Sequence, residues 1–167
     1  MLQEDPNLQD IIKDLSRAVT TQFASDEIDL FDELYAQFQQ DPTKFKQRLS
    51  SNDPLEFGLD ELLSAYTPII ISMVTITLNK LSEMIIQALK GETEDFVQEK
   101  TKKVFQRVLK GKNNEPYQSE FMTFSTQELE ALYKLGIQEG ITYGLPPNEA
   151  AKIMQRLTQP IMRVQQK

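Results

Sequence analysis

The sequence predicts an all-α fold, a compact bundle-like array of seven or eight helices around a central apolar helix at about residues 68–90. Glycine is scarce, with 6 in 167 residues, and most of the 8 prolines stand where helical patterns begin. Apolar residues recur at three- and four-residue spacing along most of the chain, and no turn joins two alternating segments as in a β-hairpin. We expect a single domain over residues 1–167, frayed only at its two ends, because this length suits one hydrophobic core.

Two amphipathic helices are predicted in the N-terminal segment. The first covers residues 7–23. Ser25 is the expected N-cap of the second helix, and the negative charges of Asp26 and Glu27 suit the dipole of its first turn. The side chains expected to face the core are Leu8, Ile11, Ile12, Leu15 and Val19 in the first helix and Ile28, Phe31, Leu34, Tyr35 and Phe38 in the second.

Three pairs of an N-cap residue and a proline predict the next helix starts. Proline fits the first helical position because its missing N–H would have no partner there. The helices are expected to end near residues 49, 66 and 90, and Gly91 can take the left-handed conformation that follows the last of them. The pairs are Asp41-Pro42, Asp53-Pro54 and Thr67-Pro68.

Clear start and stop signals bound the remaining helices. One runs from the N-cap Thr93 to Gly111. Another starts at a capping box and stops at Gly144, and the last covers residues 145–157 before Pro160 disrupts it. The capping box is Ser125 with Glu128, and the preceding loop, residues 111–125, is expected to bring Phe121 and Phe124 onto the core.

The most apolar segment is residues 65–81, and its surface could face lipid, the protein's own core or a partner protein. Residues 62–79 contain no charge, which reaches the length of a membrane span, but Pro68 and several hydroxyl side chains interrupt the run. Ile70, Val74 and Leu81 lie on one helical face over a length far beyond a typical strand. Because its first half is apolar on nearly all sides, we predict a helix buried on several sides, with a seam between two copies as the alternative.

Composition restricts the partners and the compartment. The net charge is −7, and residues 1–60 hold 13 acidic and 5 basic side chains. Such a field opposes binding to phosphates, so we expect no nucleic-acid partner. The chain has no cysteine and therefore no disulfide, and its first residues lack the pattern of a secretory signal. A cytoplasmic location is the expectation.

The side-chain inventory excludes several kinds of catalysis. Because the chain has no histidine and no cysteine, it cannot build a Ser-His-Asp triad, a Cys-His pair or a thiolate or imidazole zinc site. It also lacks the glycine-rich motifs that hold nucleotide phosphates. We therefore expect a protein without enzymatic activity, with no catalytic residue, no metal site and no cofactor.

Two charged segments are candidate docking surfaces. Asp29, Asp32 and Glu33 lie three and four residues apart, and we consider an acidic face for a basic partner, a solvated face, or part of a hard-cation site. Further along, a basic face is formed by Lys103, Arg107 and Lys110. It is suited to anionic lipid or an acidic partner, although cations near a helix C-terminus also simply stabilise the helix.

A third candidate is the series Gly136, Gly140 and Gly144 in residues 135–147. Gly136 and Gly140 stand inside a predicted helix, where each costs about 1 kcal/mol relative to alanine. This cost suggests close packing of a neighbouring helix, or a ligand groove with Tyr133 and Tyr143 in its lining.

These observations favour a soluble helical interaction or regulatory module without catalytic activity, which binds another protein or a second copy of itself. One alternative is a peripheral membrane protein that uses the apolar region 68–78 together with the basic patch 100–112. The other is a small-molecule binder with its site in a helical pocket.

Overall fold

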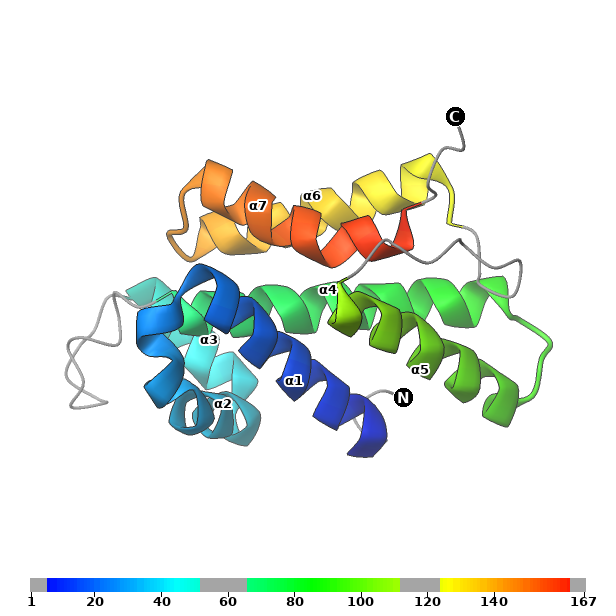
Figure 1. Ribbon diagram of the computed structural model, residues 1–167, viewed down its shortest axis with the longest axis horizontal. Helices are drawn as coiled ribbons and strands as arrows, with labels where there is room; N and C mark the ends of the chain where they lie inside the picture. The colour runs from blue at the N-terminus through cyan, green and yellow to red at the C-terminus, as the bar shows by residue number, and fades with distance from the viewer. Residues whose placement is uncertain (1–5, 52–65, 112–123, 163–167) are drawn as a thin grey trace.

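The computed structural model describes residues 6–51, 66–111 and 124–162, and these ranges are helical without any strand. The prediction of an all-α, bundle-like array is confirmed (Figure 1). The elements are α1 (Pro6–Phe23), the 3₁₀ helix η2 (Ser25–Leu30), α2 (Phe31–Gln40), α3 (Pro42–Ser51), α4 (Thr67–Ala88), α5 (Glu94–Lys110), α6 (Thr126–Thr142), α7 (Pro147–Thr158) and the 3₁₀ turn η5 (Gln159–Ile161).

The apolar helix α4 lies in the middle of this array. Figure 1 shows α6 and α7 side by side on one side of α4, and α1, α2, α3 and α5 on the other. Helix α4 packs directly against α1, α2, α5 and α6. One side of α4 is thus covered by helices that come before and after it in the chain, and the other side by the last two helices.

Two hydrophobic cores meet at α4, and this explains why its first half is apolar on nearly all sides. Ile70 and Val74 are fully buried in the larger core, which includes side chains from α1, α5, α6 and α7. Ile71, the neighbour of Ile70, is fully buried in a second core. The second core also holds four side chains of α2 and one of α3, namely Phe31, Leu34, Tyr35, Phe38 and Phe45.

The second half of α4 is amphipathic. Leu81 and Ile85 remain buried, whereas Glu83, Ile86 and Gln87 are exposed. Such a stripe is expected of a helix that has neighbours on one side only. The helix ends at Ala88, two residues before the predicted end, and Gly91 follows it with a φ of 101°.

Several predicted helix caps are confirmed. The Thr93 hydroxyl accepts a hydrogen bond from the Phe96 N–H at 3.3 Å, and Asp41 Oδ1 accepts one from the Lys44 N–H at 3.0 Å. Ser125 forms the capping box with the first turn of α6. Gly111 ends α5 in the left-handed region with a φ of 66°.

Two predicted N-caps are wrong. Ser25 does not cap an α-helix, because residues 25–30 form the 3₁₀ helix η2 and α2 begins at Phe31. Thr67 is the first residue of α4 and not its cap. The helix predicted after Asp53-Pro54 and the placement of Phe121 lie outside the described residues, whereas Phe124 is buried as expected.

A carboxylate from η2 replaces the missing cap of α4. Glu27 Oε1 accepts hydrogen bonds from the Thr67 N–H at 2.8 Å and from the Thr67 hydroxyl at 2.7 Å. Glu27 Oε2 accepts a third from the Tyr66 N–H at 3.1 Å. A carboxylate suits this place because it satisfies free N–H groups and complements the helix dipole.

A second carboxylate joins three helices near the same end of α4. Glu139 of α6 accepts a hydrogen bond from the Ser72 hydroxyl of α4 at 2.6 Å. The same oxygen lies 3.0 Å from Lys46 Nζ of α3, and the Glu139 side chain is only 14% exposed. Because a buried carboxylate without partners would be costly, these contacts favour one arrangement of α3, α4 and α6.

We expect replacement of Glu27 by alanine to lower the free energy of unfolding by about 1–2 kcal/mol, because it leaves the N-terminus of α4 without its acceptor. Chemical denaturation of Glu27→Ala checks this value. The matched control is Asp29→Asn, which removes an exposed carboxylate of the same 3₁₀ helix and should change stability by less than about 0.5 kcal/mol. Equal losses in both variants would contradict the role assigned to Glu27.

Candidate functional site

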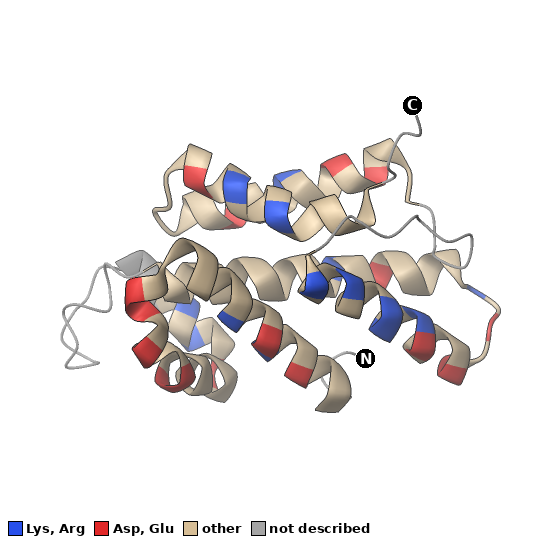
Figure 2. Ribbon diagram, in the orientation of Figure 1, with Lys and Arg blue, Asp and Glu red and all other residues tan. Residues whose placement is uncertain are grey.

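The carboxylates in the acidic stretch around Asp29 are of two kinds. Some form hydrogen bonds or ion pairs within the fold, and the others form none with a described residue. Glu27 caps α4, and Asp32 pairs with two cations of α1. The side chains of Asp26, Asp29 and Glu33 are exposed and form no ion pair or hydrogen bond with any described residue. We name these three residues the acidic surface; Figure 2 shows the acidic side of η2 and the start of α2 at one end of the molecule.

The three predicted residues Asp29, Asp32 and Glu33 do not lie on one continuous α-helix. Asp29 belongs to the 3₁₀ helix η2, whereas Asp32 and Glu33 stand in the first turn of α2. Within the described ranges, no group of three or more carboxylates is arranged to hold a metal ion. Asp29 and Glu33 remain as candidate docking residues.

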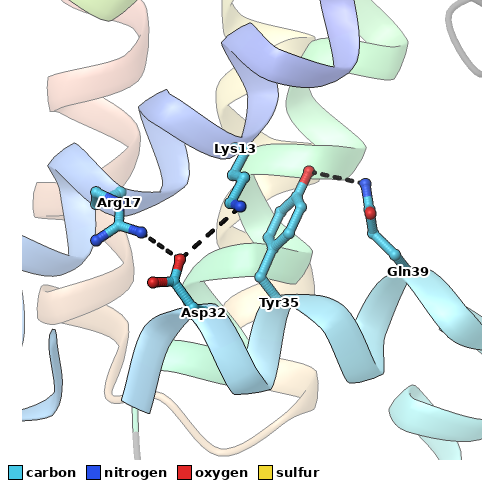
Figure 3. A network of polar contacts seen from close by, with 5 residues as sticks. All are labelled: Lys13, Arg17, Asp32, Tyr35 and Gln39. Atoms are coloured by element: carbon cyan, nitrogen blue, oxygen red, sulfur yellow. Dashed lines mark hydrogen bonds and ion pairs between the residues drawn. The ribbon is translucent and has the colours of Figure 1, made fainter. Parts of the chain in front are cut away.

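Asp32 belongs to a contact network between α1 and α2 (Figure 3). Its Oδ1 pairs with the Arg17 guanidinium and lies 3.8 Å from Lys13 Nζ. Both cations also lie over aromatic rings of α2, with Arg17 4.9 Å from the Phe31 ring centroid and Lys13 5.8 Å from that of Tyr35. Since exposed ion pairs contribute only about 0–1 kcal/mol each, this network adds little to the stability of the fold.

The predicted basic face of α5 forms without Arg107. Lys103 is exposed and pairs with Glu99 at 3.3 Å, and Lys110 is exposed at the end of the helix. Arg107 is buried, and its Nε donates a hydrogen bond to the Pro160 carbonyl oxygen at 2.5 Å. A guanidinium turns inward here because the chain reversal at η5 presents a carbonyl group to it. Lys102, next to Lys103 in the sequence, is a further exposed cation of α5.

A second arginine, Arg156, caps the C-terminal end of α5. Arg156 of α7 donates hydrogen bonds to the carbonyl oxygens of Val108 at 2.8 Å and Leu109 at 3.0 Å, which lack partners inside the helix. Its guanidinium lies against Gly111, where an added Cβ would be 2.5 Å from Arg156 Cζ. Burial lowers the pKa of Arg156. Glycine at 111 therefore serves both the left-handed φ and this close approach.

The glycines of α6 adjoin methionine side chains. A Cβ added to Gly136 would lie 2.0 Å from Met154 Sδ, and one added to Gly140 would lie 2.9 Å from Met73 Sδ. Both methionines are fully buried. The space beside Gly136 and Gly140 is thus occupied by α7 and α4, which corresponds to the close-packing alternative.

The two tyrosines proposed with these glycines lie apart from that contact. Tyr133 is half-buried, and its hydroxyl donates a long hydrogen bond to the Ala151 carbonyl oxygen of α7 at 3.5 Å. Tyr143 is also half-buried near Glu139, and burial together with that carboxylate raises the pKa of its phenol.

The apolar region 68–78 lies inside the fold, with every residue buried except the half-buried Thr75 and Ile76. Among the described helices, α4 alone is long and apolar enough to cross a membrane, and 61% of its most apolar window is buried. A core helix meets the same length and composition criterion. Use of residues 68–78 at a membrane surface would require the helices on both sides of α4 to separate.

A pocket that the sequence did not reveal lies where α1, α2, α4 and the start of α3 meet. Its volume is about 430 Å³. Gln39 Nε2 lies 3.4 Å from the Tyr35 hydroxyl and 3.5 Å from Gln9 Oε1, both at the upper limit for a hydrogen bond. Figure 3 shows Tyr35 and Gln39 rising from α2 with their polar ends adjacent. The lining residues are Gln9, Ile12, Tyr35, Phe38, Gln39, Pro42, Thr75 and Asn79.

The pocket could not be found from sequence patterns because its residues come from four helices and share no motif. The sequence gives no distinct signal for it, because Asn79 stands beside Thr77 and Lys80 in the less apolar part of α4. Comparison with protein-family models, with curated proteins and with solved structures finds no match for this chain. The assignment of function therefore depends on the chemistry of the surfaces and the pocket.

We expect Gly136→Ala to lower the free energy of unfolding by about 1 kcal/mol or more, because overpacking against Met154 outweighs the gain of about 1 kcal/mol in helix propensity. Met154→Ala should cost about 2–5 kcal/mol through the cavity it leaves. The double variant should lose less than the sum of the two, by at least about 0.5 kcal/mol. Denaturant titration of all three variants measures this coupling.

The exposed Ala131 of α6 provides the control for that cycle. Ala131→Gly reports helix propensity alone and should cost about 1 kcal/mol. A stabilising Gly136→Ala substitution, or strict additivity with Met154→Ala, would show that α6 and α7 do not pack closely at Gly136.

Burial raises the pKa of Tyr35 above its ordinary value of 10.0, with further raising from Asp10 and Asp14 and an opposing effect from the Gln39 hydrogen bond. The unfolded chain therefore loses this proton at lower pH than the folded chain does. The contribution of Tyr35 to stability is present below about pH 10 and is lost as the pH rises through the raised value.

We predict that the stability of the wild type falls more steeply than that of Tyr35→Phe above about pH 10, with a difference in slope of at most about 1.4 kcal/mol per pH unit. Urea unfolding of the wild type and of Tyr35→Phe at about pH 8, 9, 10 and 11 measures how the stability of each depends on pH. These values span the ordinary tyrosine pKa of about 10. Parallel curves would contradict the inferred burial of the phenol.

Proposed function

We propose that the chain is a non-enzymatic helical interaction or regulatory module that binds a positively charged partner through its acidic surface. The observation that carries this proposal is the exposure of the Asp26, Asp29 and Glu33 side chains, which form no ion pair or hydrogen bond with a described residue. Neighbouring Glu27 and Asp32 make defined contacts within the fold. The three free carboxylates are therefore available to a partner on a rigid framework of η2 and α2.

Charge segregation supports a basic partner. Residues 1–60 hold 13 acidic and 5 basic side chains, so the field near η2 and α2 attracts cations. Complementary charge speeds association and orients the partner before apolar contacts form. An acidic surface next to an aromatic core is suited to a basic segment of another protein.

A second copy of the chain also has suitable chemistry. The exposed lysines of α5, Lys102, Lys103 and Lys110, form a basic stripe that Figure 2 shows on a helix distant from the acidic surface. Contact between these two different surfaces would be head-to-tail, which produces rings or open chains of subunits. The mass in solution distinguishes this case from a monomer that binds another protein.

We expect Asp29→Lys with Glu33→Lys to weaken binding of a fluorescent oligolysine peptide at least tenfold at low ionic strength, because two attractive charges become repulsive. Fluorescence anisotropy measures the affinity, and circular dichroism checks that the helices persist. The charge-matched control reverses two exposed carboxylates elsewhere, Glu92→Lys with Glu130→Lys, and should retain most of the binding.

Equal weakening in both double variants would show attraction by net charge alone and would contradict a defined acidic surface. Light scattering on a size-exclusion column then identifies the partner class. A mass above the 19.2 kDa of one chain that returns to that value in Asp29→Lys with Glu33→Lys indicates a second copy as the partner.

A further inference from the structure

The pocket between α1, α2 and α4 contains hydrogen-bonding groups that the described fold leaves unused. The Asn79 carboxamide is half-buried and makes no hydrogen bond to a described residue. The Thr75 hydroxyl donates to the Ile71 carbonyl oxygen at 2.7 Å, so its lone pairs remain available as acceptors. Both residues stand one turn apart on α4, at the boundary between the two cores.

The wall opposite α4 offers a second carboxamide. Gln39 makes only two long contacts through its Nε2, and its Oε1 accepts no hydrogen bond from a described residue. The Tyr35 phenol beside it has an ordinary pKa of about 10, which burial raises further, so at neutral pH the hydroxyl carries its proton and can donate. Donors and acceptors therefore face the pocket from both α2 and α4.

The pocket is suited to an uncharged ligand. The eight described residues that line it include no aspartate, glutamate, lysine or arginine. Of the charged residues nearby, Lys13 and Asp32 are paired with each other. Asp10 and Asp14, in contrast, act as negative charges on the Tyr35 phenol. A charged ligand would find no group of opposite charge among the lining residues, and an anion would also be repelled by Asp10 and Asp14.

The walls also favour a planar ligand with an apolar face. Phe38 and Ile12 are buried side chains that present apolar surface to the pocket. A carboxamide holds a donor beside an acceptor, and it pairs with a planar edge that carries the complementary groups, as Asn and Gln do with adenine. The volume of about 430 Å³ lies within the range of about 300–1,000 Å³ that is typical of small-molecule sites.

We propose that this pocket binds a neutral nucleobase or nucleoside, with the Asn79 carboxamide as the main polar anchor, Thr75 and Gln39 as further hydrogen-bonding partners, and Phe38 against the face of the ring. The site is separate from the acidic surface, and its occupancy does not depend on the proposed protein partner.

Titration of the isotope-labelled full chain with adenosine, guanosine, cytidine and uridine, each up to about 1 mM, tests the proposal by NMR. At least one nucleoside should shift the side-chain amide signals of Asn79 and Gln39 in a saturable manner. Absence of such shifts with all four nucleosides overturns the proposal.

Variants locate the binding. Asn79→Leu should weaken the binding of the active nucleoside about tenfold, and the nearly isosteric Thr75→Val should weaken it about threefold. Gln155→Leu, an exposed amide of α7 replaced in the same way, should keep the wild-type affinity. Binding that survives both pocket substitutions, or that Gln155→Leu weakens as much as Asn79→Leu does, overturns the assignment to this pocket.

Discussion

The structure depends on the burial of α4 from two sides. Ile70 and Ile71 are consecutive residues about 100° apart around the helix axis, and each is fully buried in a different core. No single neighbouring helix can cover both. The larger core takes its other side chains from α1, α5, α6 and α7, and the second core takes them from α2 and α3, so the burial of α4 requires helices from both ends of the chain.

Polar groups near α4 restrict how its neighbours can lie. Apolar surfaces alone allow several packings, because the hydrophobic effect is not directional. Glu27 at the N-terminus of α4 and Glu139 beside Ser72 accept hydrogen bonds that require defined distances. Arg107 and Arg156 make similar contacts with backbone carbonyl groups around the end of α5. Each of these groups would be costly to bury alone, so each disfavours alternative packings.

The same principle separates structural charges from charges available to partners. Within one acidic stretch, Glu27 and Asp32 are bound to other elements, while Asp29 and Glu33 are left free. The composition of the stretch does not distinguish these four acidic residues from one another. The pocket at Asn79 is a comparable case, because its unused amide becomes significant only next to Tyr35 and Gln39.

Local sequence determined the fold class and most helix boundaries. The confirmed caps at Asp41, Thr93 and Ser125 use contacts within three residues, and such contacts form in any surroundings that permit a helix. Periodicity also identified the inward stripes of α1 and α2, whose predicted core residues are all buried, whereas the predicted Ile28 lies in η2 and is half-buried. The caps and the inward stripes depend on residues a few positions apart in the chain, and these can be read from the sequence.

Only the tertiary structure decided the properties that depend on distant residues. Thr67 was predicted to cap α4, but a carboxylate 40 residues earlier in the chain binds there instead. Arg107 has the spacing of a surface cation, yet the Pro160 carbonyl oxygen draws it inward from 53 residues away. The pocket residues come from four separate helices. A long-range contact leaves no periodic pattern, because the residues between its partners do not determine the distance between them.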